Sequence, residues 1–364
     1  MSSTHIPNNT ISLTRDHSSP KDTTDAELSN ESLSAIIAMP DWQQEYKNSF
    51  TSIERLCQYL ELNIDQLPVS KNADKQFQLR VPHSYVTRMQ KSDPQDPLLL
   101  QVLPTNDEDK NELGFLKDPV GDLQSIKTPG LLQKYQGRAL LLVSSLCAVH
   151  CRYCFRRHFP YSSQNPRQDQ WHQALEELRK DQSISEVILS GGDPLVLSDS
   201  ELAKLIKQLE QIKHVKRLRI HTRLPVVIPN RIDNNLLAWI QKSKLQVIMV
   251  LHINHAQEIN NELIQKLIKL SNINCTLLNQ SVLLKSVNDS ADNLINLSEA
   301  LFKAGVLPYY LHLLDKVDGA AHFDVAEEEA VALMRNISDQ LPGYLVPKLV
   351  KEVCGEKSKQ LLSY

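Results

Sequence analysis

Three cysteines lie within eight residues of the sequence, in the segment LVSSLCAVHCRYCFRRHFPY. Cys147, Cys151 and Cys154 have the spacing C-x3-C-x2-C, and thiolates on one short loop can bind three irons of a [4Fe–4S] cluster. The fourth iron would then lack a protein ligand and could bind a small molecule. The spacing also leaves zinc open, with His150 or His158 completing a tetrahedral set. A closed zinc finger usually has a second, distant cysteine pair, and the sequence contains none.

The composition excludes several classes of protein. Hydrophobic residues make up 41% of the 364 residues, enough for the core of one large domain or two ordinary ones. The formal net charge is −3, from 40 basic and 43 acidic residues, which argues against a nucleic-acid or anionic-membrane partner. No apolar stretch reaches membrane-spanning length, and residues 1–30 lack the hydrophobic segment of a signal peptide. We therefore expect a cytoplasmic protein.

The remaining cysteines support the same compartment. Six cysteines in a chain of this length do not form a disulfide framework when three of them cluster. We expect Cys57, Cys275 and Cys354 to be small buried hydrophobic residues.

From residue 138 onward, short β-rich runs alternate with amphipathic stretches. This alternation predicts βα units and a parallel sheet. Six such units favour an α/β fold, a partial (β/α)6 TIM-like barrel, with a doubly wound open sheet as the alternative. The β-rich runs lie at 139–145, 186–192, 217–222, 246–252, 275–284 and 307–314, and the amphipathic stretches at about 170–181, 199–213, 233–242, 257–272, 289–303 and 324–340.

The rest of the chain flanks this core. Residues 1–35 have the polar composition of a disordered tail. Residues 36–137 are predicted to form a mainly helical N-terminal region, in which 41–63 has helical apolar spacing. The barrel core then covers 138–345, and 346–364 forms a C-terminal segment.

Polar or reactive residues follow the end of each predicted strand. The cysteines follow the first, GGDP (191–194) the second, HTRLP (221–225) the third and HINH (252–255) the fourth, while NQS (279–281) and Asp315 come at or after the last two. Barrel active sites assemble from loops at the carboxyl ends of the strands. The sequence therefore predicts one site at that face.

Several of these residues also have simpler interpretations. The glycines of GGDP either let the backbone approach a ligand or merely form a βα turn. Arginines 152, 156 and 157 suit carboxylate recognition, but each alone is better explained as a solvated charge. His252 and His255 are better explained as polar loop contacts than as metal ligands.

The motifs taken together resemble the lysine 2,3-aminomutase family of radical S-adenosylmethionine (SAM) enzymes. The resemblance covers about residues 80–359. It rests on a series of segments in the family's order: RALLLVSSLCAVHCRYCFRRHFPY, VILSGGDPL, RIHTRLPVVIPNRI, HINH, LLNQSVLLKSVND, PYYLHLLDKVDGAAHF and GYLVPKLVKEV.

The resemblance implies three cofactors and a set of binding residues. The three cysteines would bind the [4Fe–4S] cluster, and SAM would bind its open iron. Pyridoxal 5′-phosphate (PLP) would bind covalently to Lys359, in a segment whose lysines otherwise look like solvated charges. The implied contacts are Gly191, Gly192 and Asp193 for SAM; Arg138, Lys134 and Gln280 for the PLP phosphate; and Arg156, Asp315 and Glu352 for the carboxylate and ε-ammonium group of lysine.

The implied activity is that of an isomerase. It converts (S)-α-lysine to (R)-β-lysine, which a separate ligase attaches to elongation factor P, and it needs an electron donor. The alternatives are a radical SAM methyltransferase or activase, which would need no PLP, and a zinc-stabilised binding module without chemistry.

Three features depart from the family pattern. Glu352 replaces an aspartate, Lys134 replaces an arginine, and Lys359-Gln360-Leu361 replaces Lys-Thr-Pro. The larger mutases also continue into a zinc-binding segment with further cysteines. This sequence does not contain that segment, so the resemblance implies no zinc here.

Overall fold

Seven parallel strands in sequence order organise the protein. The computed structural model describes residues 41–161, 171–273 and 275–364, in which one sheet has the order β1 to β10. Strands β3 to β9 are parallel, and β1, β2 and β10 extend the two edges antiparallel. The strands are β1 (Ile126–Thr128), β2 (Leu131–Leu132), β3 (Arg138–Ser144), β4 (Glu186–Gly191), β5 (Arg217–Thr222), β6 (Gln246–His252), β7 (Cys275–Val282), β8 (Leu307–His312), β9 (Lys348–Lys351) and β10 (Gln360–Leu361).

The predicted partial barrel is confirmed, with one addition. All six expected strands are present as β3 to β8, and their order in the sheet follows the sequence without the reversal of a doubly wound sheet, which excludes that alternative. Strand β9 adds a seventh parallel strand that was not predicted from the sequence. Its four residues, KLVK, are too few to produce a clear periodic pattern.

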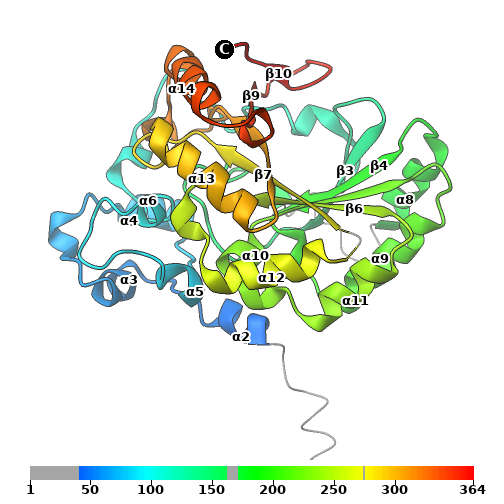
Figure 1. Cartoon of the computed structure of the whole chain (residues 1–364), viewed down its shortest axis with the longest axis horizontal. Helices are drawn as coiled ribbons and strands as arrows, with labels where there is room; N and C mark the ends of the chain where they lie inside the picture. Colours follow the sequence, from blue (N-terminus) through cyan, green and yellow to red (C-terminus); the bar gives the residue numbers. More distant parts are fainter. Residues whose placement is uncertain (1–40, 162–170, 274) are drawn as a thin grey trace, which may run out of the picture. The chain divides into compact units, whose positions relative to one another are not determined.

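The six expected helices are also confirmed, and side chains define where several of them begin. Ser198 and Glu201 form a capping box at α9, and Ser290 caps α13. Helices α9 and α11 contact each other outside the strands (Figure 1). The helices are α2 (Asp41–Lys47), α3 (Ile53–Tyr59), α4 (Lys71–Gln76), α5 (His83–Val86), α6 (Pro97–Leu100), α8 (Trp171–Lys180), α9 (Asp199–Glu210), α10 (Leu224–Val227), α11 (Asn234–Lys242), α12 (Asn261–Ser271), α13 (Ala291–Lys303) and α14 (Glu327–Gln340).

The N-terminal region is more broken than its helical spacing suggested. The expectation of helix throughout 41–63 is wrong, because α2 and α3 are separate. Phe50 pairs with Val81 in an isolated β-bridge, and the Ser52 side chain accepts a hydrogen bond from the Arg55 backbone to start α3. The expected polar tail, residues 1–35, lies outside the described residues.

The two faces of the sheet differ in burial. In β5, Leu218 and Ile220 are fully buried in the core beneath the helices. Arg217, Arg219 and His221 alternate with them and are only partly buried. Because side chains alternate between the faces of a strand, the second face carries polar groups into the barrel interior. None of the described helices is long and apolar enough to cross a membrane.

The last residues pack against the sheet. Gln360 and Leu361 of β10 pair with Lys351 and Val350 of β9, and the Leu362 amide donates to the Leu349 carbonyl at 3.0 Å. Figure 1 shows β10 beside β9 at the carboxyl end of the chain. This pairing orders the backbone next to position 359.

The prediction that Cys354, in the C-terminal segment, is buried is wrong. Cys57 and Cys275 are buried as expected, but Cys354 is exposed. It lies in the turn between β9 and β10, where no apolar layer covers it.

Two glycines bring the ends of β3 and β4 together. The Gly192 amide donates to the Ser144 carbonyl at 2.7 Å, and the Asp193 amide donates to the Leu146 carbonyl at 2.7 Å. A Cβ at Gly191 or Gly192 would lie well inside van der Waals contact with the backbone at Ser144 or Leu146. Because glycine has no side chain, the start of the cysteine loop can lie directly against β4.

Replacing Gly192 by alanine should therefore damage the fold locally. The added Cβ meets backbone that cannot rotate away, so we expect Gly192→Ala to lower the free energy of unfolding by about 1–3 kcal/mol. Urea denaturation measures this. Gly343→Ala is the matched control, because a Cβ at that position would have no atom within 4 Å, and its effect should stay within about 0.5 kcal/mol. Equal effects at both positions would contradict the packing argument.

Candidate active site

The three clustered cysteines lie on the loop that follows β3. All three are free thiols and partly buried. Burial, and then the charge of Cys151, raise the pKa of the Cys154 thiol to about 11. Within residues 41–161, 171–273 and 275–364, no three histidine, cysteine, aspartate or glutamate side chains are arranged to hold a single metal ion. A [4Fe–4S] cluster needs a different arrangement, because each of its irons takes its own cysteine sulfur.

Two arginines of this loop are bound by one carboxylate. Glu108 accepts from Arg152 Nε and Nη2 at 2.8 and 2.6 Å, and from Arg157 Nη2 at 2.8 Å. Arg152 is 0% exposed and also donates to the Ala73 carbonyl at 3.2 Å. The interpretation of these arginines as solvated charges is therefore wrong. They fasten the cysteine loop to the N-terminal region.

Asp193, which follows β4, forms hydrogen bonds with residues at the end of β5. Its carboxylate accepts hydrogen bonds from the Thr222 hydroxyl at 2.7 and 2.9 Å. Backbone amides of Arg223 and Leu224 donate to it at 2.7 and 2.8 Å, and the Leu195 amide donates at 3.0 Å. These contacts give Asp193 a structural role, and its predicted contact with SAM stays a prediction.

A second cluster of charges surrounds Lys359. Its ammonium group forms an ion pair with Glu352. The same carboxylate accepts from the Tyr135 hydroxyl at 2.6 Å and lies 3.5 Å from Lys134 Nζ. Burial opposes ionisation of Glu352, but Lys359, Tyr135 and Lys134 outweigh it and lower the pKa. Glu352 thus contacts two other residues named by the resemblance, Lys359 seven positions away and Lys134 218 positions away.

Asp122 joins this cluster to the arginine at position 156. It forms ion pairs with Lys134 at 2.7 Å and with Arg156 at 2.7 Å, and Arg156 also donates to the Ser190 hydroxyl at 2.9 Å. Asp122 and Ser190 were not recognised from the sequence. Asp122 lies in a loop without a periodic pattern, so no local signal marked it.

Asp315 faces the same charges without a direct ion pair to them. Burial raises its pKa to about 7, with Lys359 lowering it and Glu352 raising it. A cavity of about 320 Å³ opens onto Asp315 and Glu352. The rest of its lining comes mainly from 313–316, 324–327 and the loop around Pro119.

Three histidines, partly or fully buried, line the sheet face that points into the barrel. Gln280 lies 3.0 Å from His252, and burial lowers the pKa of His252 to about 3, so that its ring is neutral. Nε2 of His221 and of His312 is buried without a hydrogen-bond partner among the described residues. Lys359 is close enough to lower the pKa of both rings further, after the larger effect of burial.

A polar ligand in the barrel could form hydrogen bonds with the unpaired Nε2 atoms of His221 and His312. Arg138 stacks on the ring of Tyr135 at 4.6 Å and lies at the start of β3. Of the predicted site residues, Glu352 contacts both Lys134 and Lys359, and Arg156 joins them through Asp122. Arg138 stacks on Tyr135, Asp315 faces the same charges, and Gln280 contacts His252. The cysteines and GGDP form the other part of the site.

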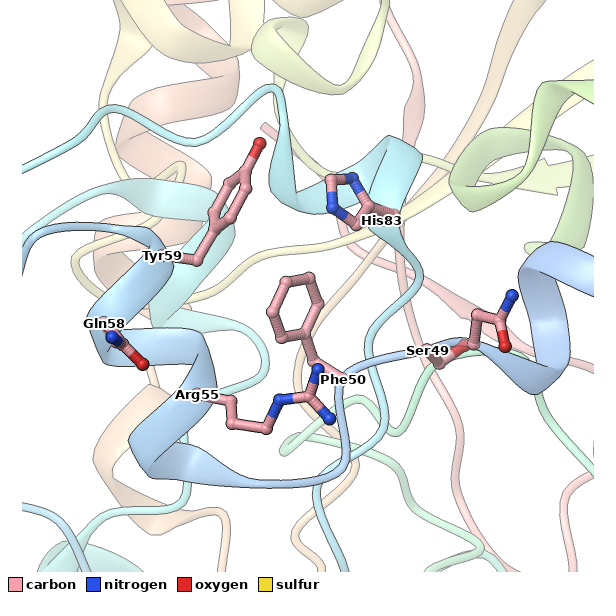
Figure 2. Close-up of a pocket in the computed structure, with 7 residues that line it drawn as sticks. Ser49, Phe50, Arg55, Gln58, Tyr59 and His83 are labelled. Atoms are coloured by element: carbon pink, nitrogen blue, oxygen red, sulfur yellow. The ribbon is translucent and has the colours of Figure 1, made fainter.

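A separate cavity of about 330 Å³ lies in the N-terminal region. Figure 2 shows the ring of Phe50 beside those of Tyr59 and His83, with Arg55 and Gln58 at its side. The ring centroids of Phe50 and Tyr59 are 5.5 Å apart. None of its lining residues belongs to the predicted site.

The sequence of this chain matches known proteins. Residues 141–278 match the family described as the Radical SAM superfamily. An "L-lysine 2,3-aminomutase" of Escherichia coli K12 is 50% identical over 320 residues, which cover 88% of this chain and 93% of the relative. That of Haemophilus influenzae is 47% identical over 88% of this chain and 95% of its own. That of Clostridium subterminale is 31% identical over 88% of this chain and 77% of its own.

Removing the charge of Glu108 should destabilise the cysteine loop. Glu108→Gln keeps the size of the side chain but leaves two buried arginines without a counter-charge, so we expect a loss of about 3–5 kcal/mol in the free energy of unfolding. Urea denaturation provides the measurement. Glu112 is exposed, and Glu112→Gln should change stability by less than about 0.5 kcal/mol. A small effect of Glu108→Gln would mean that water compensates both arginines.

The raised pKa of Asp315 predicts a pH-dependent stability. An ordinary aspartate has a pKa of about 3.9, so the protonated acid favours the folded state at low pH. This contribution is lost as the pH rises through the folded-state pKa of about 7. We therefore expect Asp315→Asn to raise the melting temperature more at about pH 8 than at about pH 5.

Asp339, exposed at the end of α14, supplies the control. Asp339→Asn should shift the melting temperature equally at both pH values. An Asp315→Asn shift that does not depend on pH would show that Asp315 ionises normally in the folded protein.

Proposed function

The chain belongs to the lysine 2,3-aminomutase family of radical SAM enzymes, and from this membership we propose that it is an isomerase converting (S)-α-lysine to (R)-β-lysine. The observation that carries the proposal is the charge cluster of Lys359, Glu352, Lys134 and Asp122 inside the barrel. A methyltransferase or an activase has no need of it.

The cysteine loop would hold the iron–sulfur cluster. Three free, partly buried thiols on one loop suit a cluster with one open iron. Gly191, Gly192 and Asp193 lie against the start of that loop and would support SAM. When bound, the cluster and SAM supply a carbon radical that can remove a hydrogen atom from the substrate, and PLP holds the migrating nitrogen.

Lys359 is the residue we propose for PLP. The pairing of β10 with β9 fixes the backbone beside it, and the partnerless nitrogens of His221 and His312 lie within the electrostatic reach of its amine. Arg138, Lys134 and Gln280 would bind the phosphate. Lys134 Nζ already contacts the Val120 carbonyl, Asp122 and Glu352, so binding a phosphate would replace one of these three contacts.

Three further side chains would hold the substrate. Arg156, fixed by Asp122 and Ser190, would bind the lysine carboxylate through its guanidinium group. Asp315 and Glu352 line one cavity and would bind the ε-ammonium group. Glu352 is paired with the Lys359 ammonium in the ligand-free protein. With PLP held covalently on Lys359, the amine would no longer be a free ammonium group, and Glu352 would be available to the substrate cation.

The extra methylene of Glu352 matters in this exchange. A glutamate side chain reaches further than the aspartate of the family pattern, and here it reaches Lys359, Lys134 and Tyr135 together.

We propose that β-lysine made here serves the modification of elongation factor P by a separate ligase, in a reducing cytoplasm with a protein electron donor. The 50% identity with the Escherichia coli relative supports the isomerase on which this role rests.

Anaerobic incubation with L-lysine tests the proposal. With a reconstituted cluster, SAM, a reductant and PLP, the protein should form β-lysine, and omitting PLP should abolish product. Borohydride reduction followed by peptide mapping should place a phosphopyridoxyl group on Lys359. Lys359→Ala should lose both the adduct and the product, because the amine proposed to bind PLP is then absent.

Lys357, two residues away and exposed, supplies the matched control. Lys357→Ala should keep the adduct and the activity. Product formed without PLP, or an adduct on Lys357, would overturn the assignment of Lys359. Complete absence of β-lysine from the fully loaded protein would overturn the proposed reaction.

A further inference from the structure

A buried arginine touches the cysteine loop from the side of β5. Arg223 directly follows β5 and is only 5% exposed. Its Nη1 lies 2.8 Å from the Cys151 sulfur and also contacts the Tyr153 hydroxyl. A cationic donor at this distance forms a charge-assisted hydrogen bond with a thiolate.

The other end of the guanidinium group is fixed by buried acceptors. Nη2 donates to Glu258 at 2.9 Å, to Gln101 at 2.8 Å and to the Tyr85 hydroxyl at 3.0 Å. Glu258 is 0% exposed, so this ion pair is shielded from water. Attraction between charges is stronger in such surroundings than at the surface.

The counter-ion is itself held in place. Glu258 accepts from the backbone amides of Asn254 and His255 at 2.9 and 3.1 Å. Asn254 in turn donates to the Tyr153 hydroxyl at 2.7 Å. The tyrosine rings at 85 and 153 flank the Arg223 guanidinium at 5.5 and 5.7 Å. The arginine therefore cannot swing away from Cys151 without breaking several buried contacts.

Arg223 resembles none of the other arginines near the loop. Arg152 and Arg157 also pair with a buried acid, but no hydrogen bond links their side chains to a cysteine sulfur among the described residues. Nε of Arg223 lacks a hydrogen-bond partner there although it is buried. Its two terminal nitrogens make the contacts described above, with Cys151 on one side and Glu258 on the other.

We propose that Arg223 and Glu258 together set the reduction potential of the iron–sulfur cluster at Cys151. This inference rests on the proposed function, since it takes the cysteine loop as the cluster site. Reduction adds one negative charge to the cluster and its sulfur ligands. A fixed cation beside one sulfur stabilises the reduced form, and a nearby anion opposes it. Charge and hydrogen bonds to the sulfurs are among the properties that determine cluster potentials.

The two residues act through the cluster and are positioning residues rather than catalytic ones. The cation favours uptake of the electron, whereas Glu258 limits that effect and keeps the reduced cluster a strong enough reductant to be useful. Their effects on the potential must therefore have opposite signs. A purely structural role would not give opposite signs, because loss of either partner loosens the same loop.

The test is a redox titration of the reconstituted protein followed by electron paramagnetic resonance, without SAM. In Arg223→Gln the reduction equilibrium should fall at least tenfold, which is about 59 mV toward more negative potential for one electron. In Glu258→Gln the reduction equilibrium should rise, and the potential should become less negative. Glu299→Gln, an exposed position on α13, is the matched control and should leave the potential unchanged.

Iron and acid-labile sulfide are measured in every variant, so that potentials are compared at equal cluster content. Shifts of the same sign, or no shift, in the two variants would overturn the inference. If Arg223→Gln does not fold, Glu258→Gln and Arg223→Lys, which retains the charge and should shift less than tenfold, still decide it. A wild-type protein that takes up no cluster would instead overturn the cofactor assignment itself.

Discussion

Each cation that the barrel buries near its candidate site must find an acid within the protein, and this requirement organises the structure. Arg152 and Arg157 share Glu108, Lys134 and Arg156 share Asp122, and Arg223 pairs with Glu258. Unpaired charges in such positions would cost several kcal/mol each. Glu108 and Asp122 come from the N-terminal region. That region is therefore part of the site, since without it the cysteine loop would carry uncompensated charge.

The charge balance of the Lys359 cluster explains how a ligand-free site can be stable. Three acids (Asp122, Asp315 and Glu352) face three cations (Lys134, Arg156 and Lys359). Glu352 and Asp122 are ionised against these cations, while the pKa of Asp315 near 7 lets it be neutral or charged. The site can therefore accept an additional cation by ionising Asp315 or by giving up one of its own. The charges of the polar interior are balanced in this way without a bound ligand.

The sequence was informative where a property is local. Alternation of apolar residues marked six strands and six helices, and the cysteine spacing marked its loop, because these patterns lie within a few residues of each other. The ionic partners could not be predicted, because Glu108 and Arg152 are 44 residues apart and Asp122 and Arg156 are 34 apart. GGDP and HTRLP were placed correctly at strand ends, and residues 279–281 lie within the last part of β7. Yet Arg223, within HTRLP, was not recognised, since only the fold brings Cys151 to it.

The short strand β10 has a consequence for how the site exchanges its contents. Two residue pairs and one hydrogen bond from the Leu362 amide hold β10 to β9, and the exposed turn around Cys354 and Gly355 connects the two strands. Elements with so few buried contacts open at a much smaller free energy than the whole domain. Lys359, which directly precedes β10, therefore belongs to a segment that can open locally. Local opening of residues 353–364 would therefore cost less free energy than unfolding of the domain, and strands β3 to β9 would keep their register during it.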